Sequence, residues 1–298
     1  MFFNLIISKL RSWIGASGHE MFAICSRIPL LFRATPKNAI RTTHSQPEFT
    51  VEIVVTAFAP LATAISHDLH HNGFFTSTNL LPPTIITTIR NESIVLRETG
   101  RFEQSWSEGF DSKGNSRRFD KEGVFACEPD GGDYELAPHL LTYMTGVITH
   151  LPRLLNNCDS GIYSISDTAY NAKLAVTEPG GSTYPLHVDN PLGLSASPAD
   201  TRKLTCILYL NPNYCIDDDD GGELRLVVST NSATAPVDLT PVGGRIVLFW
   251  SDEIPHEVLP TGSNCDDRFA LTLWLPTSNA EVLHSETSKF RTLRYIDG

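Results

Sequence analysis

Positive charge is scarce in this chain and is concentrated at its start. The 298 residues contain 23 Lys and Arg against 34 Asp and Glu, which gives a formal net charge of -11. Residues 1–47 hold six basic side chains and one acidic side chain, so this segment carries +5 and the remainder -16. Nucleic-acid binding requires clustered Lys and Arg to neutralise phosphates. We therefore expect no nucleic-acid partner.

Long apolar runs and closely paired cysteines are also lacking. No stretch approaches the ~20 apolar residues that a membrane-spanning helix needs, because the segment 21–32 is short and contains Arg27. The six cysteines are scattered, with no CxxC pair, unlike the dense disulfide framework of a small secreted domain. These features favour a protein without a membrane segment, with reduced thiols, in the cytoplasm or the nucleus.

The basic, acid-poor segment 1–49 has two interpretations. Organellar transit peptides are Arg-rich and poor in acidic residues, so the segment is either a targeting sequence or a disordered tail. The first interpretation would direct the protein to an organelle.

Apolar periodicity predicts helices first and strands afterwards. Apolar residues at helical spacing indicate helices over 50–71, 82–99 and 138–156, and Asn72-Gly73 provides a C-terminal signal for the first. The polar stretch 101–132 indicates a long hairpin or lid. Short strands are predicted over 172–176, 204–210, 223–228, 245–250 and 269–275.

This order predicts an α+β fold in which helices cover one face of a largely antiparallel β sandwich. One domain is expected over 50–280, with helical support in 50–160 and a β core in 161–280. Residues 281–298 would form a C-terminal tail.

Two of the predicted strands have one purely apolar face and one mixed face. Side chains alternate along a strand, so residues two apart share a face. The mixed faces hold Thr205, Ile207 and Tyr209 on one strand and Arg268, Ala270, Thr272 and Trp274 on the other. We expect these faces to line a ligand cavity, with the helices covering the face that contains Phe269.

His187-Val188-Asp189 and the later His256 suggest a metal site. Two histidines and one carboxylate form the facial triad of non-heme Fe(II) oxygenases, which leaves the remaining coordination positions open. The triplet alone has little specificity. Arg268 follows His256 by 12 residues, and its guanidinium suits the carboxylate of a dicarboxylate cosubstrate such as 2-oxoglutarate. Tyr209 would give that carboxylate a second hydrogen bond.

Several ordered motifs resemble the 2-oxoglutarate-dependent prolyl 4-hydroxylases, and among them the oxygen-sensing hypoxia-inducible factor prolyl hydroxylases. The matching runs are YPLHVDNP (184–191), LTCILYLN (204–211), GGELRL (221–226), FWSD (249–252), PHEV (255–258) and RFALTLW (268–274). The resemblance extends over roughly residues 60–280.

The resemblance implies a double-stranded β-helix (jelly-roll) core and the cofactors Fe(II), 2-oxoglutarate and O2, with ascorbate supporting turnover. It also implies hydroxylation of proline C4 in a protein substrate by a monomeric enzyme, coupled to conversion of 2-oxoglutarate to succinate and CO2. The residues it assigns are His187, Asp189 and His256 as iron ligands, Arg268, Tyr209 and Thr272 near 2-oxoglutarate, and Tyr184 at the entrance. The stretch 101–126 matches a mobile loop that closes over the peptide.

One departure leaves alternatives open. The relatives usually carry a tyrosine ten residues before the first iron-binding histidine, where this chain has Thr177. Thr177 motivates the alternative of a catalytically silent metal-binding β-helix protein. Because the triad and the cosubstrate site do not specify the substrate, hydroxylation of another side chain or of a small molecule is a further alternative.

Three other features receive simple interpretations. The acidic turn 217–220 lacks the alternating ligands of an EF-hand loop and is expected to be a solvated turn. His70-His71 is expected at a helix end, where the helix dipole favours histidine. Arg117-Arg118 either contacts an acidic substrate or keeps the loop soluble.

Overall fold

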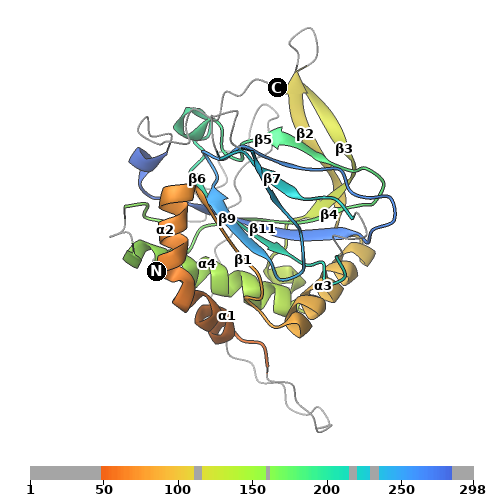
Figure 1. Cartoon of the computed structure of the whole chain (residues 1–298), viewed down its shortest axis with the longest axis horizontal. Helices are drawn as coiled ribbons and strands as arrows, with labels where there is room; N and C mark the ends of the chain where they lie inside the picture. Colours follow the sequence, from red (N-terminus) through yellow and green to blue (C-terminus); the bar gives the residue numbers. More distant parts are fainter. Residues whose placement is uncertain (1–47, 111–115, 159–161, 215–219, 229–234, 284–298) are drawn as a thin grey trace, which may run out of the picture.

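A computed structural model describes residues 48–110, 116–158, 162–214, 220–228 and 235–283, without the side chains of 107–119 (Figure 1). The basic segment 1–47, most of the predicted tail, most of the acidic turn and the side chains of Arg117 and Arg118 lie outside these residues. In the view of Figure 1, four helices lie along the lower and left sides of two antiparallel sheets.

The major sheet has seven strands in the order β1-β9-β6-β11-β4-β3-β2. Every neighbouring pair in it is antiparallel. Its strands, in chain order, are β1 (Phe74–Ser77), β2 (Glu103–Phe110), β3 (Ser116–Cys127), β4 (Asn171–Thr177), β6 (Arg202–Tyr209), β9 (Ile246–Trp250) and β11 (Arg268–Pro276).

The minor sheet has four short strands in the order β5-β10-β7-β8. These strands are β5 (Tyr184–His187), β7 (Leu224–Leu226), β8 (Val237–Leu239) and β10 (His256–Val258). Residues of both sheets line one cavity, so the two sheets form the walls of a jelly-roll, a double-stranded β-helix.

The helices cover the face of the major sheet that points away from this cavity. They are α1 (Val51–Phe58), α2 (Ala62–Asn72), α3 (Pro83–Glu98) and α4 (Pro138–Cys158), with 3-10 turns η1 (Ala59–Leu61), η2 (Gly131–Asp133), η3 (Gly193–Ser195) and η5 (Ala280–Val282). The Trp250 indole donates a hydrogen bond to the Leu69 carbonyl over 2.9 Å. The Arg90 guanidinium of α3 lies 5.1 Å from the centroid of the Phe269 ring. The predicted helical cover is therefore confirmed.

The prediction of which side chains of the two central strands face the cavity is also confirmed. Thr205, Ile207 and Tyr209 of β6 line the cavity together with the mixed face of β11. The opposite faces pack into the helix-covered core, where Cys206 is 1% exposed and Leu271 is fully buried. Cys206 thus behaves as a small buried hydrophobe, and the four cysteines that the structure describes are free.

Several predicted boundaries are wrong. The helix expected over 50–71 is two α-helices joined by η1, because Pro60 has no N–H to continue the hydrogen-bond ladder. Its end is correct, since Gly73 has a φ of 81° and caps α2, whose last turn contains His70 and His71. The third helix continues to Cys158, and the strand expected over 223–228 contains only Leu224–Leu226. The polar stretch 101–132 includes the β2–β3 hairpin.

Three strands were not anticipated from the sequence. β5, β8 and β10 contain three or four residues each, which is too short for an alternating pattern to be distinct. Two of them carry candidate metal ligands.

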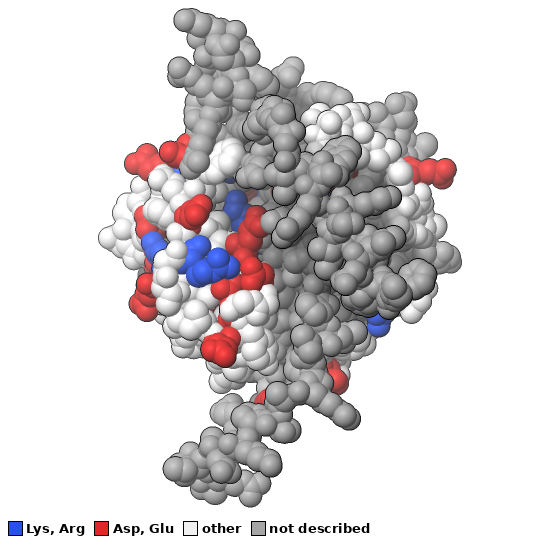
Figure 2. Space-filling model, turned by 180° about the vertical axis from the view of Figure 1, so that it is seen from behind, with Lys and Arg blue, Asp and Glu red and all other residues white. Residues whose placement is uncertain are grey.

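Charges of both signs are mixed on the surface. In the view from behind, the coloured part of the surface shows basic side chains beside acidic ones (Figure 2). Among the described residues, no helix is both long and apolar enough to span a bilayer.

The contact between α1 and α4 gives a test of the helical packing. A Cβ on Gly146 of α4 would lie 2.7 Å from Val54 Cβ of α1. Alanine favours a helix over glycine by about 1 kcal/mol, but the overlap should cost more. We expect Gly146→Ala to lower the free energy of unfolding by about 1–3 kcal/mol, measured by urea denaturation. Gly131→Ala is the control, because no atom lies within 4 Å of its added Cβ. Equal stability of the two variants would contradict the packing.

Candidate active site

Pairing of β5 with β10 brings the two candidate histidine ligands together. His187 ends β5, His256 begins β10, and the two residues are direct partners in the antiparallel register. Their ring centroids are 4.3 Å apart. Since 68 residues separate them in the chain, the sheet creates this proximity.

Asp189 completes the cluster from just beyond the end of β5. Its Oδ1 lies 3.6 Å from His187 Nε2 and 3.8 Å from His256 Nε2. Within the described part of the chain, these are the three His, Cys, Asp or Glu side chains whose ligand atoms all lie within 4.8 Å of one another. The side chains of Asp189 and His256 are each 7% exposed and that of His187 is 30% exposed, so one side of the cluster is open.

The second nitrogen of each imidazole is held by the backbone. His187 Nδ1 lies 2.8 Å from the Pro185 carbonyl oxygen, and His256 Nδ1 lies 3.0 Å from that of Ile254. A carbonyl only accepts, so each Nδ1 carries the proton and donates it. Both Nε2 atoms keep their lone pairs, and such hydrogen bonds fix the tautomer of metal-binding histidines.

The surroundings favour the protonation states that metal binding requires. Burial and the neighbouring His187 lower the pKa of His256 to about 4. Burial raises the pKa of Asp189, but His256 and His187 more than offset this effect and leave it well below its usual range. At neutral pH the cluster therefore holds a neutral imidazole at His256 and a carboxylate at Asp189, as a metal site needs.

A chain of hydroxyl groups holds the second oxygen of Asp189. Thr205 Oγ1 donates to Asp189 Oδ2 over 2.7 Å and lies 2.7 Å from Ser251 Oγ. Thr205 and Ser251 are both fully buried. The Arg202 guanidinium donates to the Asp189 backbone carbonyl over 2.7 Å. Both the carboxylate and the backbone of Asp189 are thus fixed by β6.

A buried ionic cluster holds the turn that leads to His256. Lys203 Nζ lies 3.0 Å from Asp252 Oδ1 and 2.7 Å from Glu253 Oε1. The side chains of Lys203 and Asp252 are 1% and 0% exposed, respectively. Removing one partner of a buried ion pair destabilises a protein by about 3–5 kcal/mol. The path of the chain from β9 to β10 therefore depends on Lys203.

Arg268 and Tyr209 line the other end of the same cavity. Arg268 Nε donates to the Gly222 carbonyl over 2.8 Å, and the guanidinium carbon lies 5.0 Å from the centroid of the Tyr209 ring. A Cβ at position 222 would lie 2.9 Å from Arg268 Cδ, so glycine leaves room for the arginine. The Tyr209 hydroxyl is buried with no hydrogen-bond partner among the described residues.

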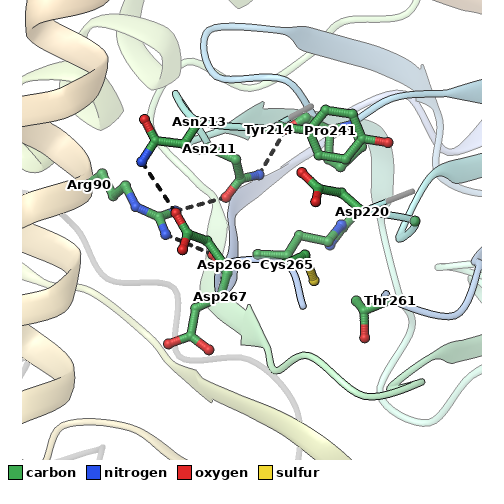
Figure 3. A pocket seen from close by; sticks show the side chains of 12 residues that line it. Arg90, Asn211, Asn213, Tyr214, Asp220, Pro241, Thr261, Cys265, Asp266 and Asp267 are labelled. Carbon is green, nitrogen blue, oxygen red and sulfur yellow. Dashed lines mark hydrogen bonds between the residues drawn. The ribbon is translucent and has the colours of Figure 1, made fainter. Parts of the chain in front are cut away.

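Asn211 and Arg90 anchor the start of β11. Asn211 Oδ1 accepts hydrogen bonds from the Phe269 N–H over 2.7 Å and from Arg90 Nη1 over 2.9 Å. Arg90 Nη2 donates to the Asp267 carbonyl over 2.9 Å. Figure 3 shows Arg90 and Asn211 among the residues that line a hollow, together with Asp220, Asp266 and Asp267. Arg268 borders both this hollow and the cavity that contains the His-Asp-His cluster.

The remaining candidate residues also face this cavity. Thr272 lines it from β11, and Tyr184 of β5 lies with its ring centroid 4.6 Å from that of His187. Burial raises the pKa of Tyr184 to about 12, so its hydroxyl keeps its proton. Thr177 lines the cavity opposite Arg268 in the β4–β11 register.

Sequence reasoning missed three residues of the site. Thr205 and Trp274 were placed on cavity-facing strand faces but received no role. Lys173 of β4 also lines the cavity. Strand alternation could have identified it, because it shares a face with Ala175 and Thr177.

Comparison with known proteins agrees with this geometry. Residues 172–276 match the family model described as the 2OG-Fe(II) oxygenase superfamily, so this part of the chain is similar to that superfamily. Within that class it is similar to the hypoxia-inducible factor prolyl hydroxylases. It is 37% identical over 136 residues to "Hypoxia-inducible factor prolyl hydroxylase" of Caenorhabditis elegans, covering 45% of this chain and 16% of that protein.

It is also 35% identical over 150 residues to "Prolyl hydroxylase EGLN3" of Mus musculus, covering 49% of this chain and 56% of that protein. The matches thus span about half of EGLN3 and a smaller part of the nematode protein. Among solved structures, a Trichoplax adhaerens prolyl hydroxylase in complex with a hypoxia-inducible factor peptide fragment is 27% identical, with a TM-score of 0.58, covering 83% of this chain and 97% of that one. A Pseudomonas putida prolyl-4-hydroxylase at 23% identity, with a TM-score of 0.56 and coverage of 73% of this chain and 100% of that one, shares the fold.

The hydroxyl chain behind Asp189 gives a test of the metal cluster. Thr205→Val removes the hydrogen bond to Asp189 Oδ2 with little change in volume. Loss of a group that orients a metal ligand weakens metal binding by about 10–100-fold, and we expect this loss for Mn(II) by isothermal titration calorimetry. Thr272→Val is the matched control, because Thr272 lines the same cavity but does not hold a ligand of the cluster. An unchanged Mn(II) affinity in Thr205→Val would contradict this role.

Proposed function

We propose that this chain is an Fe(II)- and 2-oxoglutarate-dependent dioxygenase that hydroxylates proline at C4 in a protein substrate. The observation that carries the proposal is that one cavity has a His-Asp-His cluster at one end and the Arg268–Tyr209 pair at the other. We assign the dioxygenase domain to residues 50–280.

The donor set of the cluster fits iron. His187, Asp189 and His256 offer two neutral imidazoles and one carboxylate, which is the ligand set of non-heme Fe(II) oxygenases. The open side of the cluster faces the cavity, where a cosubstrate and O2 would bind. In this proposal Thr205 holds the carboxylate in position, and the carbonyls of Pro185 and Ile254 hold the imidazoles.

The other end of the cavity fits the distal carboxylate of 2-oxoglutarate. A guanidinium binds a carboxylate through charge-assisted hydrogen bonds. The buried Tyr209 hydroxyl lacks a partner among the described residues, and a buried polar group normally has one. A carboxylate between Arg268 and Tyr209 would satisfy that hydroxyl, and Thr272 lies two positions beyond Ala270 on the same face of the strand.

The cofactors supply the oxidation, in which 2-oxoglutarate, O2 and a proline C–H give succinate, CO2 and hydroxyproline. The residues of the chain bind and orient the reactants. Arg268 and Tyr209 would fix the cosubstrate, and Tyr184, which keeps its phenolic proton, would hydrogen-bond at the entrance. We expect ascorbate to support turnover.

A peptide substrate is supported by the surroundings of the entrance. Tyr184 lies there, and the β2–β3 hairpin extends from the edge of the major sheet beside β4. The Trichoplax adhaerens structure holds a hypoxia-inducible factor peptide fragment, and that protein is 27% identical to this chain. We infer that the hairpin contacts the protein substrate and that the protein acts in an oxygen-dependent response.

Thr177 favours a second candidate, which is metal and cosubstrate binding without turnover. It is buried and lies opposite Arg268, where a smaller side chain enlarges the cosubstrate end of the cavity. Such a protein would bind Fe(II) and 2-oxoglutarate but release no succinate.

Hydroxylation of proline peptides tests the proposed reaction. Purified protein with Fe(II), 2-oxoglutarate, O2 and ascorbate should add one oxygen atom to the proline of an accepted peptide and form one succinate per hydroxylation, measured by mass spectrometry. His256→Ala should abolish both products, because it removes a ligand. Peptide-independent succinate release alone would argue for a different substrate, and absence of succinate with every substrate would favour the silent binding protein.

Variants at the other end of the cavity test the cosubstrate site. Arg268→Gln should raise the KM for 2-oxoglutarate by on the order of 100-fold, because it leaves a carboxylate without its cation. Tyr209→Phe should raise this KM less, without lowering the Tm of the protein in the absence of 2-oxoglutarate, since the removed hydroxyl has no partner among the described residues. Arg225→Gln controls for lost charge, because Arg225 pairs with Asp238 outside the cavity. An unchanged KM in Arg268→Gln would contradict the site.

A further inference from the structure

Two lysines from different strands surround Tyr184 at the cavity. Lys121 Nζ of β3 lies 3.4 Å from the centroid of the Tyr184 ring, and Lys173 Nζ of β4 lies 6.0 Å from it. Lys121 is 8% exposed, and Lys173 lines the same cavity as the metal cluster. Both ammonium groups therefore lie within 6.0 Å of the same ring, whose centroid is 4.6 Å from that of the candidate iron ligand His187.

Neither lysine forms an ion pair with a carboxylate in the described part of the chain. Lys173 Nζ donates to the neutral Ser105 hydroxyl over 3.1 Å, and Lys121 Nζ lies over the face of the Tyr184 ring. Asp189 of the His-Asp-His cluster acts electrostatically on both ammonium groups, and Glu128 also acts on that of Lys173. By contrast, the buried Lys203 contacts two carboxylates.

Such an arrangement is unfavourable without a ligand. Burial and repulsion from Lys173 lower the pKa of Lys121 to about 7, and burial also lowers the pKa of Lys173. Buried charges are normally paired because desolvation is costly. A bound anion would offset the repulsion between the two ammonium groups and give both of them a partner of opposite charge.

The strand register separates these lysines from the distal carboxylate of 2-oxoglutarate. Lys173 is the partner of Thr272 in the β4–β11 register, whereas Arg268 is the partner of Thr177. The four-residue offset between these levels corresponds to about 13 Å along a strand. Lys121 belongs to the β2–β3 hairpin, on the side where we place the protein substrate. This placement favours an anion from the substrate.

We propose that Lys121 and Lys173 form an anion subsite that binds a carboxylate of the substrate, the side chain of a Glu or Asp close to the target proline. The inference rests on the proposed function for the identity of the substrate. The subsite itself depends only on the two lysines and can be tested by binding.

Paired peptides test the subsite directly. Proline peptides carrying one Glu at each flanking position in turn, and the matching Gln peptides, are titrated into the full chain with Mn(II) and 2-oxoglutarate under nitrogen. At one position the Glu peptide should bind about tenfold more tightly than its Gln partner, as expected for one charge-assisted contact. Equal affinity of Glu and Gln peptides at every position would overturn the proposal.

Variants test whether the two lysines cause the preference for the Glu peptide. Lys121→Gln and Lys173→Gln should each bring the Glu and Gln peptides to nearly equal affinity, while Lys173→Arg should retain most of the preference. Arg153→Gln is the matched control, because it removes one positive charge at an exposed position where Arg153 pairs with Asp167. A Glu preference that survives both Gln variants would also overturn the proposal.

Two further readouts are needed. One distinguishes a substrate subsite from a cosubstrate site, and the other separates failure of the subsite from failure of the proposed reaction. If the Gln variants weaken 2-oxoglutarate binding without affecting the Glu preference, the lysines bind the cosubstrate and the proposal fails. If the Glu preference is lost in the Gln variants but no peptide gains hydroxyproline in air, the anion subsite stands and the proline hydroxylase assignment fails.

Discussion

The antiparallel pairing of β5 with β10 is the constraint on which the rest of the site depends. It makes His187 and His256 direct partners, and it does so with two strands of only four and three residues. Strands of this length are weak alone, so the surrounding structure must hold them. β7 pairs with the other edge of β10, and the Lys203 cluster fixes the turn before His256.

Polar interactions make this local geometry rigid. Asp189 is held through its carboxylate by Thr205 and through its backbone by Arg202, and Arg268 follows a segment held by Asn211 and Arg90. All of these groups belong to or contact the long strands β6 and β11, which form the centre of the major sheet. The candidate ligands lie on or beside short strands, but their positions are set by the buried central strands of the major sheet. This is the preorganisation that a metal site needs.

The long elements could be predicted from the sequence because their periodicity is strong. Alternation along β6 and β11 was enough to place Thr205, Tyr209, Arg268 and Trp274 on the faces that line the cavity. The pairing of β5 with β10 could not be predicted, because short strands carry no pattern and their partners are distant in sequence. Lys173 was missed for another reason: a lysine in a strand is usually solvated, and only the packing of β3 and β5 around it leaves it half-buried.

The position of β4 between β3 and β11 has a consequence for how the chain tolerates change in length. One face of β4 presents Lys173, Ala175 and Thr177 to the cavity, while its backbone is paired with the hairpin on one edge and with the Arg268 strand on the other. A single residue inserted within β4 would turn the side chains beyond it to the opposite face of the sheet, toward the helix-covered core. It would also shift the pairing register with both neighbouring strands by one residue. Variation in length is therefore restricted to the turns at either end of β4. The distance along β4 between the level of Lys173 and the level of Thr177 is accordingly fixed by the sheet.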